Sequence, residues 1–297
     1  MSPEKFLPRI NSPQDLKQLS LDELKHLASE IRAAIIDTVA RNGGHLASNL
    51  GAVELTLALH YVFDSPHDKI IWDVGHQCYT HKLLTGRREA FGRLRQSGGL
   101  LGYPSREESE YDTYNTGHAS TALSAALGLS VARDKKNEDY NVIAVVGDGS
   151  LTGGVAYEAL NQIGHLRKKL IIVLNYNEMS ISPSVGALSS YLSYLVSGQP
   201  FLKMKEQAKS VLRTIPKIGR PLIKAARAFE DLIKKTFFPG LFFEELGIRY
   251  VGPIHGHSLH SLIEAFENAR NYPGPVLVHC VTQKGKGYRP AQLDPEK

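Results

Sequence analysis

Cysteine is scarce in this sequence, and long apolar runs are missing from it. Two of the 297 residues are cysteines, Cys78 and Cys280, and neither has a second cysteine at a metal-ligand spacing. This excludes a disulfide framework and fits a reducing compartment. No run reaches the ~18 apolar residues that a transmembrane helix needs. We therefore expect a cytoplasmic protein with no membrane partner.

Residues 1–16 contain acids and prolines but no apolar core, so we expect neither a signal peptide nor a transit peptide there. The net charge of +5 is uneven, because residues 199–240 hold ten Lys and Arg against three Asp and Glu. A basic segment raises the possibility of nucleic-acid binding. This one has no zinc-ligand spacing and no recognised motif, so we interpret it as a solvated helical face and expect no nucleic-acid partner.

Apolar segments rich in β-formers alternate with segments of helical periodicity. The expected strands cover 69–76, 141–149, 168–177 and 275–282, and they are apolar throughout. Continuous rather than alternating apolar strands, joined by helices, are typical of a parallel sheet that is covered on both faces. We therefore predict a doubly wound, mostly parallel α/β fold with helices on both faces.

The expected helices are marked by caps and by apolar spacing. Ser20 and Glu23 form a capping box that starts the first helix. In the helix expected over 154–166, the periodicity groups four apolar residues on one side. These are Val155, Ala159, Ile163 and Leu166.

The chain divides into an α/β domain and an excursion from it. Residues 1–182 and 241–297 carry the strand and helix patterns of the domain. Residues 183–240 are basic and only partly helical, and their Pro and Gly spacing breaks the periodicity. We interpret them as a mobile excursion from the core.

A glycine-rich stretch, Gly147–Gly154, follows the strand expected over 141–149. Its Asp-Gly pair could form a hairpin turn. The next segment has helical periodicity, however, and this favours a strand, a Gly-rich loop and a helix N-terminus. Such an arrangement binds anions, because backbone N–H groups and the helix dipole both favour negative charge.

An acid inside a phosphate site suggests a bridging cation. Asp148 would repel a diphosphate unless Mg²⁺ lay between them, and Mg²⁺ commonly shares oxygen ligands between protein and phosphates. Further ligands could come from Asn175, Asn177 or the Met179 backbone, one helical crossover later. In parallel sheets such strand ends meet at the ligand-binding edge.

The pair Asp148 and Asn177 resembles the signature of thiamine-diphosphate enzymes. That resemblance implies that Asp148, Asn177 and the Met179 carbonyl hold Mg²⁺. Further stretches resemble one branch of these enzymes, the 1-deoxy-D-xylulose-5-phosphate synthase family. They occur in the family's order at 43–60, 71–88, 109–124, 177–182 and 281–288.

The resemblance implies a role for each of several residues. His45, His76 and His118 would line the cleft as catalytic candidates, and each lies in a Gly-flanked loop rather than on an apolar helix face. Imidazole can donate to an oxyanion or move a proton near neutral pH. Contacts to the cofactor are implied for His76, Gly117, His118, Ser120, Gly147, Asp148, Gly149, Ser150, Asn177 and Lys284.

The implied reaction joins pyruvate and D-glyceraldehyde 3-phosphate into 1-deoxy-D-xylulose 5-phosphate and CO₂, with thiamine diphosphate and Mg²⁺ as cofactors. This reaction begins the non-mevalonate route to isoprenoids and also feeds thiamine synthesis. Family members carry further pyrimidine-binding and C-terminal domains, which we do not find in these 297 residues. We therefore expect a homodimer, or a complex with a second chain. The alternatives are the N-terminal subunit of a split transketolase and a non-catalytic fragment.

Three positions depart from the family pattern. His255 stands where the family has Asp in an Asp-Gly-His motif, so any hydrogen bond accepted by that acid is in doubt. Ala119 replaces a serine and loses a hydroxyl. Thr80 replaces a proline and restores a backbone N–H donor.

Overall fold

The sheet has five strands in the order β1-β2-β3-β5-β4, and every neighbouring pair is parallel. This is seen in a computed structural model, which describes residues 5–177, 186–197 and 240–294. The carboxyl ends of all five strands therefore lie at one edge of the sheet. The strands are β1 Lys69–Trp72, β2 Val142–Gly147, β3 Leu170–Tyr176, β4 Arg249–His255 and β5 Pro275–Val281.

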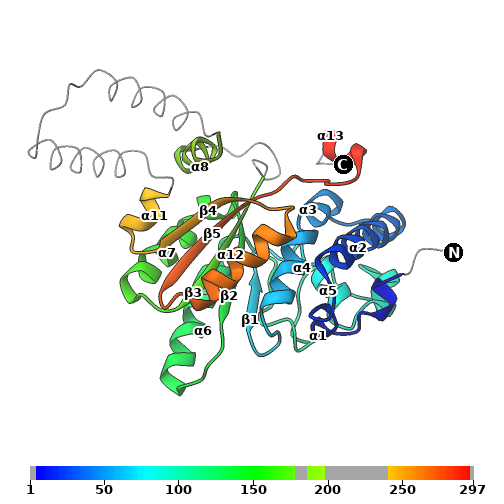
Figure 1. Ribbon diagram of the computed structural model, residues 1–297, viewed down its shortest axis with the longest axis horizontal. Coiled ribbons are helices and arrows are strands. Elements are labelled where there is room, and N and C mark those ends of the chain that lie inside the picture. Colours follow the sequence, from blue (N-terminus) through cyan, green and yellow to red (C-terminus); the bar gives the residue numbers. More distant parts are fainter. Residues whose placement is uncertain (1–4, 178–185, 198–239, 295–297) are drawn as a thin grey trace, which may run out of the picture.

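Helices cover both faces of this sheet (Figure 1), which confirms the predicted α/β fold. The capping box predicted at Ser20 and Glu23 starts α2, and Gly43 caps its end. The α-helices are α1 Pro13–Leu16, α2 Leu21–Asn42, α3 Leu46–Gly51, α4 Val53–Val62, α5 Tyr79–Leu84, α6 Ala122–Lys136, α7 Gly154–Leu166, α8 Ala187–Ser197, α11 Leu241–Glu245, α12 Leu259–Asn271 and α13 Arg289–Leu293. The 3₁₀-helices are η1 Leu7–Arg9, η2 Glu89–Arg93 and η3 Ser150–Thr152.

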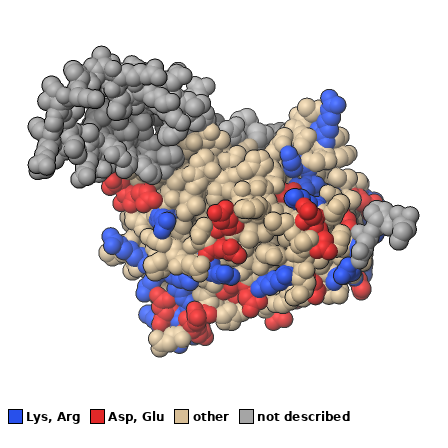
Figure 2. Space-filling view, in the orientation of Figure 1, with Lys and Arg blue, Asp and Glu red and all other residues tan. Residues whose placement is uncertain are grey.

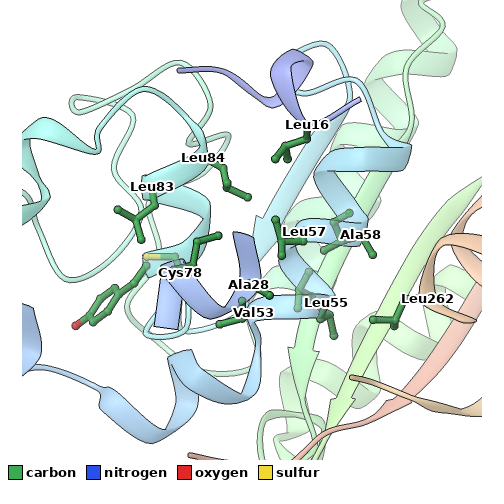
Figure 3. Packing of buried hydrophobic residues seen from close by; sticks show 14 of the residues in the cluster. Leu16, Ala28, Val53, Leu55, Leu57, Ala58, Cys78, Leu83, Leu84 and Leu262 are labelled. Carbon is green, nitrogen blue, oxygen red and sulfur yellow. The ribbon is translucent and has the colours of Figure 1, made fainter. Parts of the chain in front are cut away.

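Alternate strand residues point into two separate cores. In β1, Ile70 and Trp72 join the core under α2, α4 and α12, whereas Ile71 joins the core under α6 and α7. The first of these cores is seen close by in Figure 3, where residues of α2, α4, α5 and α12 pack together. Burial on both faces explains why the strand sequences are apolar throughout.

The chain reverses its direction across the sheet once. It runs from β1 to β2 to β3 with α6 and α7 on one face, then returns from β4 to β5 with α12 on the other. Right-handed crossovers produce this arrangement. The connection after β3 leads to α8 on the α7 side, and the connection after β5 leads to α13 beside α3 (Figure 1). Ligands bind at such a switch point in doubly wound folds.

Two details differ from the sequence interpretation. The first strand ends at Trp72 rather than at His76, because Val74 has a left-handed backbone (φ 57°) that turns the chain. In α7 the buried side consists of Ala156, Ala159, Leu160 and Ile163. Two of the four grouped residues are therefore on the wrong side: Val155 is 49% exposed and Leu166 is 42% exposed.

Part of the predicted excursion over 183–240 packs against the core. Within it, α8 buries Leu192 and Leu195 in the core under α6 and α7. Residues 198–239, which hold all ten Lys and Arg of this excursion, lie outside the described residues. On the face shown in Figure 2, acidic and basic side chains are interspersed over the described surface. Among the described helices, none has the length and apolar character to cross a membrane.

The two sides of α7 give a stability test. Replacing the fully buried Ile163 by alanine removes core contacts, and we expect it to lower the free energy of unfolding by about 2–5 kcal/mol. The matched variant Leu166→Ala, one turn away on the exposed side, is expected to change it by less than about 0.5 kcal/mol. Urea denaturation of both variants measures the difference. Equal losses of unfolding free energy would contradict the finding that Ile163 is on the buried side of α7 and Leu166 on the exposed side.

Candidate active site at the carboxyl edge of the sheet

Asp148 and Asn177 follow neighbouring parallel strands. The register pairs Gly147 of β2 with Asn175 of β3, so each residue lies one or two positions beyond a paired end. Neighbouring strands are about 4.8 Å apart. Asp148 is buried, with 3% of its surface exposed. Met179, the third predicted ligand, lies outside the described residues.

The sequence left Asn175 and Asn177 as alternative ligands, and the structure separates them. The Asn175 Oδ1 atom accepts a hydrogen bond from the Thr282 hydroxyl at 2.5 Å, which ties β3 to the end of β5. Asn175 is buried by this contact. Its oxygen is thus already engaged by Thr282.

The glycine-rich stretch forms a turn with open space beside it. After β2 the chain makes η3 and then enters α7 at Gly154. A Cβ atom added at Gly147, Gly154 or Gly117 would meet no heavy atom of the described residues within 4 Å. A phosphate group can approach a backbone of this kind closely.

A buried acid links this turn to the end of β1. Asp73 accepts hydrogen bonds from the amides of Ser120 (2.9 Å) and Ala122 (3.0 Å). The Ser120 hydroxyl in turn donates to the carbonyl of Ser150 at 2.7 Å. Two predicted cofactor-binding positions, Ser120 and Ser150, are thereby brought together. The hydroxyl of Ser120, a residue predicted to contact the diphosphate, therefore donates its hydrogen bond to another protein group.

His45 and His76 lie against each other. Their ring centroids are 5.5 Å apart in an edge-to-face arrangement, and the ring of Tyr103 contacts His45 at 5.6 Å. Burial, together with the charges of His45 and Lys284, lowers the pKa of His76 to about 4. Burial also lowers the pKa of His45, together with the charge of Arg95. Both rings are therefore neutral near pH 7.

Each of these two rings has one buried nitrogen without a hydrogen bond in the described part of the chain. The Nδ1 atoms of His45 and His76 are buried and have no hydrogen-bond partner among the described residues. Buried polar atoms are rarely left without partners, so such atoms are candidates for contact with a ligand. His118, the third predicted histidine, is exposed and makes no ring contact within the described residues.

Lys284 reaches the same region from β5. The Gly285 amide donates to the Ala47 carbonyl at 2.8 Å, which docks the loop after β5 on α3. Gly51 leaves little room for a side chain there, because a Cβ atom would lie 3.0 Å from the Gln283 carbonyl oxygen. The structure therefore places Lys284 close enough to influence His76.

A cavity of about 580 Å³ opens beside Tyr103, whose ring contacts His45. Its lining includes Arg95, Tyr103 and Thr116, and the hydroxyl of Thr116 is buried without a partner among the described residues. A cavity of this size suits a small polar molecule. A second, smaller cavity of about 340 Å³ lies by residues that precede β2 and β3, at the opposite edge.

Sequence reasoning missed a charged network that supports the loop of Lys284. Glu54 pairs with Arg32 at 2.6 Å and with Nδ1 of His257 at 2.9 Å. The His257 Nε2 atom accepts the Gln283 amide proton at 2.8 Å. Burial alone would raise the pKa of Glu54, but hydrogen bonds from His257 and Arg32 lower it to about 2. Charged residues in otherwise apolar helices are the signal that could have revealed this network.

A second missed network holds the segment that lines the cavity. Asp112 accepts a bidentate pair from Arg87 (2.6 and 3.0 Å), and His81 contacts it at 2.9 Å. Lys82 and Arg87 both pair with Glu108. These groups are almost completely buried, so removing one partner would leave an uncompensated charge. The network fixes the chain between α5 and α6.

The departures at His255 and Thr80 have local explanations. The amide of His257 donates to Nδ1 of His255 at 3.3 Å, so an imidazole accepts one bond at the position where the family has an acid. Thr80 lies in the first turn of α5. Backbone N–H groups there have no partner within a helix, so proline and threonine are both tolerated.

Comparison with known proteins identifies the family. The profile of the 1-deoxy-D-xylulose-5-phosphate synthase family matches residues 7–282. The chain belongs to this family. This confirms the resemblance drawn from the motifs and sets aside a split transketolase.

Curated relatives carry the same name. The chain is 55% identical over 290 residues to 1-deoxy-D-xylulose-5-phosphate synthase 1 of Geobacter sulfurreducens, covering 98% of this chain and 46% of that protein. It is 57% identical over 292 residues to 1-deoxy-D-xylulose-5-phosphate synthase of Caldanaerobacter subterraneus subsp. tengcongensis, covering 98% and 47%. The chain thus spans about half the length of the curated relatives it matches.

Solved structures of more distant proteins share the fold. Transketolase from Campylobacter jejuni matches 91% of this chain with a TM-score of 0.65 at 20% identity, over 39% of its own length. Transketolase from Leishmania mexicana matches 91% with a TM-score of 0.64 at 20% identity, over 37% of its length. These similarities show a transketolase-like α/β fold.

Glu54 gives a pH-dependent test. Its pKa falls from 4.5 in the unfolded chain to about 2 in the folded one, so its stabilisation is complete above about pH 4.5 and lost as the pH falls towards 2. The difference is about 3 kcal/mol. We expect wild type to lose more stability than Glu54→Gln between pH 6 and 3. Denaturant unfolding at each pH measures this, and parallel curves would contradict it.

Proposed function

We propose that this chain binds thiamine diphosphate through Mg²⁺ and supplies the diphosphate-binding half of a 1-deoxy-D-xylulose-5-phosphate synthase. The observation that carries the proposal is the buried carboxylate of Asp148 beside Asn177, at adjacent parallel strand ends. A carboxylate and an amide oxygen are ligands that Mg²⁺ accepts, with phosphate oxygens completing its shell. The Met179 carbonyl would be the third protein ligand.

The open glycine turn supports a diphosphate site next to this cation. Room beside Gly147 and Gly154 lets phosphate oxygens approach backbone N–H groups and the N-terminus of α7. Gly149 and Ser150 lie in the same turn. Gly117 and His118 belong to the neighbouring loop that Asp73 and Ser120 hold against it.

The histidines and the lysine would act on the reacting end of the ligands. Bound thiamine diphosphate supplies a carbanion on its thiazolium ring, and the protein positions and tunes it. His45 and His76 are held neutral by burial, so their Nδ1 atoms, which have no partner among the described residues, can accept a proton or a hydrogen bond. Lys284 adds positive charge near His76. We propose that His118 contributes a third imidazole from the rim.

The reaction of the complete protein would be the condensation of pyruvate with D-glyceraldehyde 3-phosphate, releasing CO₂. This is the first step of the non-mevalonate route to isoprenoids, and it also feeds thiamine synthesis. Both substrates are small and anionic, and the cavity beside Tyr103 with Arg95 on its wall suits such molecules. We further propose a cytoplasmic protein that works as a homodimer or with a chain that carries the pyrimidine-binding domain.

Asp148→Asn tests the cation site. We expect at least a ~10-fold loss of Mg²⁺-dependent affinity for thiamine diphosphate, because the amide removes the charge that attracts the cation. Isothermal titration calorimetry with and without Mg²⁺ measures the affinity.

Asp68→Asn is the matched control for that variant. Asp68 is as buried as Asp148 but lies at the opposite end of the sheet, where it accepts the Asn141 amide at 2.7 Å. The Asp68→Asn variant is expected to be less stable than wild type but to keep its affinity for the cofactor. If Asp148→Asn binds as tightly as wild type, the proposed function is wrong.

Turnover separates the enzyme proposal from a non-catalytic role. We expect residues 1–297 alone to bind thiamine diphosphate without converting pyruvate and glyceraldehyde phosphate, since they span under half of the curated relatives. Adding a purified pyrimidine-binding domain from such a relative should restore product. The formation of 1-deoxy-D-xylulose 5-phosphate, followed by chromatography, measures this. Binding with no product in the reconstituted mixture would favour the non-catalytic alternative.

A further inference from the structure

The side chain of Asn49 is fully buried in α3 and makes three hydrogen bonds to backbone. Its Nδ2 atom donates to the carbonyls of His45 and His76, each at 2.7 Å. Its Oδ1 atom accepts the amide proton of Tyr79 at 2.8 Å. One side chain therefore joins the start of α3 to the loop after β1 and to the start of α5.

These partners determine which way the amide points. Two carbonyls face its nitrogen and one N–H faces its oxygen, so the flipped amide would set like groups against each other. The asparagine side chain is long enough to form hydrogen bonds with all three backbone groups. Aspartate could still accept the proton of the Tyr79 amide, but it would repel both carbonyls.

The two carbonyls that Asn49 holds belong to the histidine pair of the candidate site. The His45 and His76 rings are 5.5 Å apart, and the Nδ1 atom of each has no partner among the described residues. Among the described residues, Nδ1 therefore anchors neither ring. Their placement depends on the backbone, through Asn49 and through the Tyr79 hydroxyl, which accepts the His45 amide at 3.3 Å.

We propose that Asn49 is a positioning residue that sets the separation and orientation of His45 and His76. What the two histidines do for the cofactor rests on the proposed function, whereas their placement by Asn49 does not. Asn49 touches no reacting group itself. Its effect on ligand binding must therefore pass through His45 and His76, and this distinguishes it from a core residue that affects only stability.

The first measurement uses the chain without cofactor. Nitrogen-15 spectra of the histidine rings at pH 7, assigned with His45→Ala and His76→Ala, report the surroundings of each ring. Asn49→Asp is expected to shift the signals of both His45 and His76. The control Thr56→Val removes another fully buried hydrogen bond, from the Thr56 hydroxyl to the Ala52 carbonyl at 2.7 Å, and should shift neither.

Tyr79→Phe provides a milder variant in case Asn49→Asp does not fold. It removes only the hydroxyl that accepts the His45 amide, so the His45 signal should shift while that of His76 stays in place. Unchanged ring signals in a folded Asn49→Asp would overturn the proposal. If Asn49→Asp is unfolded, Tyr79→Phe tests the premise that backbone contacts set the position of the His45 ring. An unchanged His45 signal in Tyr79→Phe would then overturn the proposal.

The second measurement is a double-mutant cycle on thiamine diphosphate affinity with Mg²⁺. We expect Asn49→Asp to weaken binding at least ~10-fold in the wild-type background, but by less than about threefold where His76 is already alanine. Equal losses in both backgrounds would mean that Asn49 does not act through His76, and the proposal would be wrong. If the wild-type chain binds no thiamine diphosphate, the proposed function fails, while the ring signals still decide the role of Asn49.

Discussion

The parallel register between β2 and β3 is the constraint on which the candidate site depends. Pairing of Gly147 with Asn175 makes two polar segments emerge side by side from an apolar sheet. The side chains of these strands alternate between two cores, so a slip of one residue would move each apolar residue to the opposite face. Core packing on both faces therefore fixes where Asp148 and Asn177 emerge. Hydrophobic burial of the strands therefore determines the geometry of the site.

Buried polar contacts then hold the loops at that edge. Asp73 accepts hydrogen bonds from amides at the start of α6, Asn175 ties β3 to β5, and Asn49 joins α3 to the loop after β1. Each contact satisfies backbone or side-chain groups that would otherwise be buried without partners, which costs about 1–3 kcal/mol per group. Loops fixed in this way can present glycine backbone and neutral imidazoles to a ligand without further ordering.

The sequence predicted the sheet and the strand ends well, because both are local properties. Apolar segments define the strands, and polar residues that follow them must meet at one edge of a parallel sheet. The ties between loops could not be predicted, since Asp73 and Ser120 are 47 residues apart and Glu54 and His257 are 203 apart. The side of α7 was misjudged because periodicity finds apolar residues but not the face that a neighbour covers, and α7 keeps Val155 exposed.

His255 shows how the loop after β4 works without the acid of the family pattern. Its Nδ1 atom accepts the His257 amide proton, so the imidazole provides the acceptor but not the negative charge of a carboxylate. The orientation of His257 does not require that charge, because Glu54 binds its Nδ1 atom and the Gln283 amide binds its Nε2 atom. Glu54 in turn keeps its own charge through Arg32. The negative charge near His257 therefore comes from α4 rather than from β4, and the loop that carries Lys284 is held in place by a residue that lies 230 positions earlier in the chain.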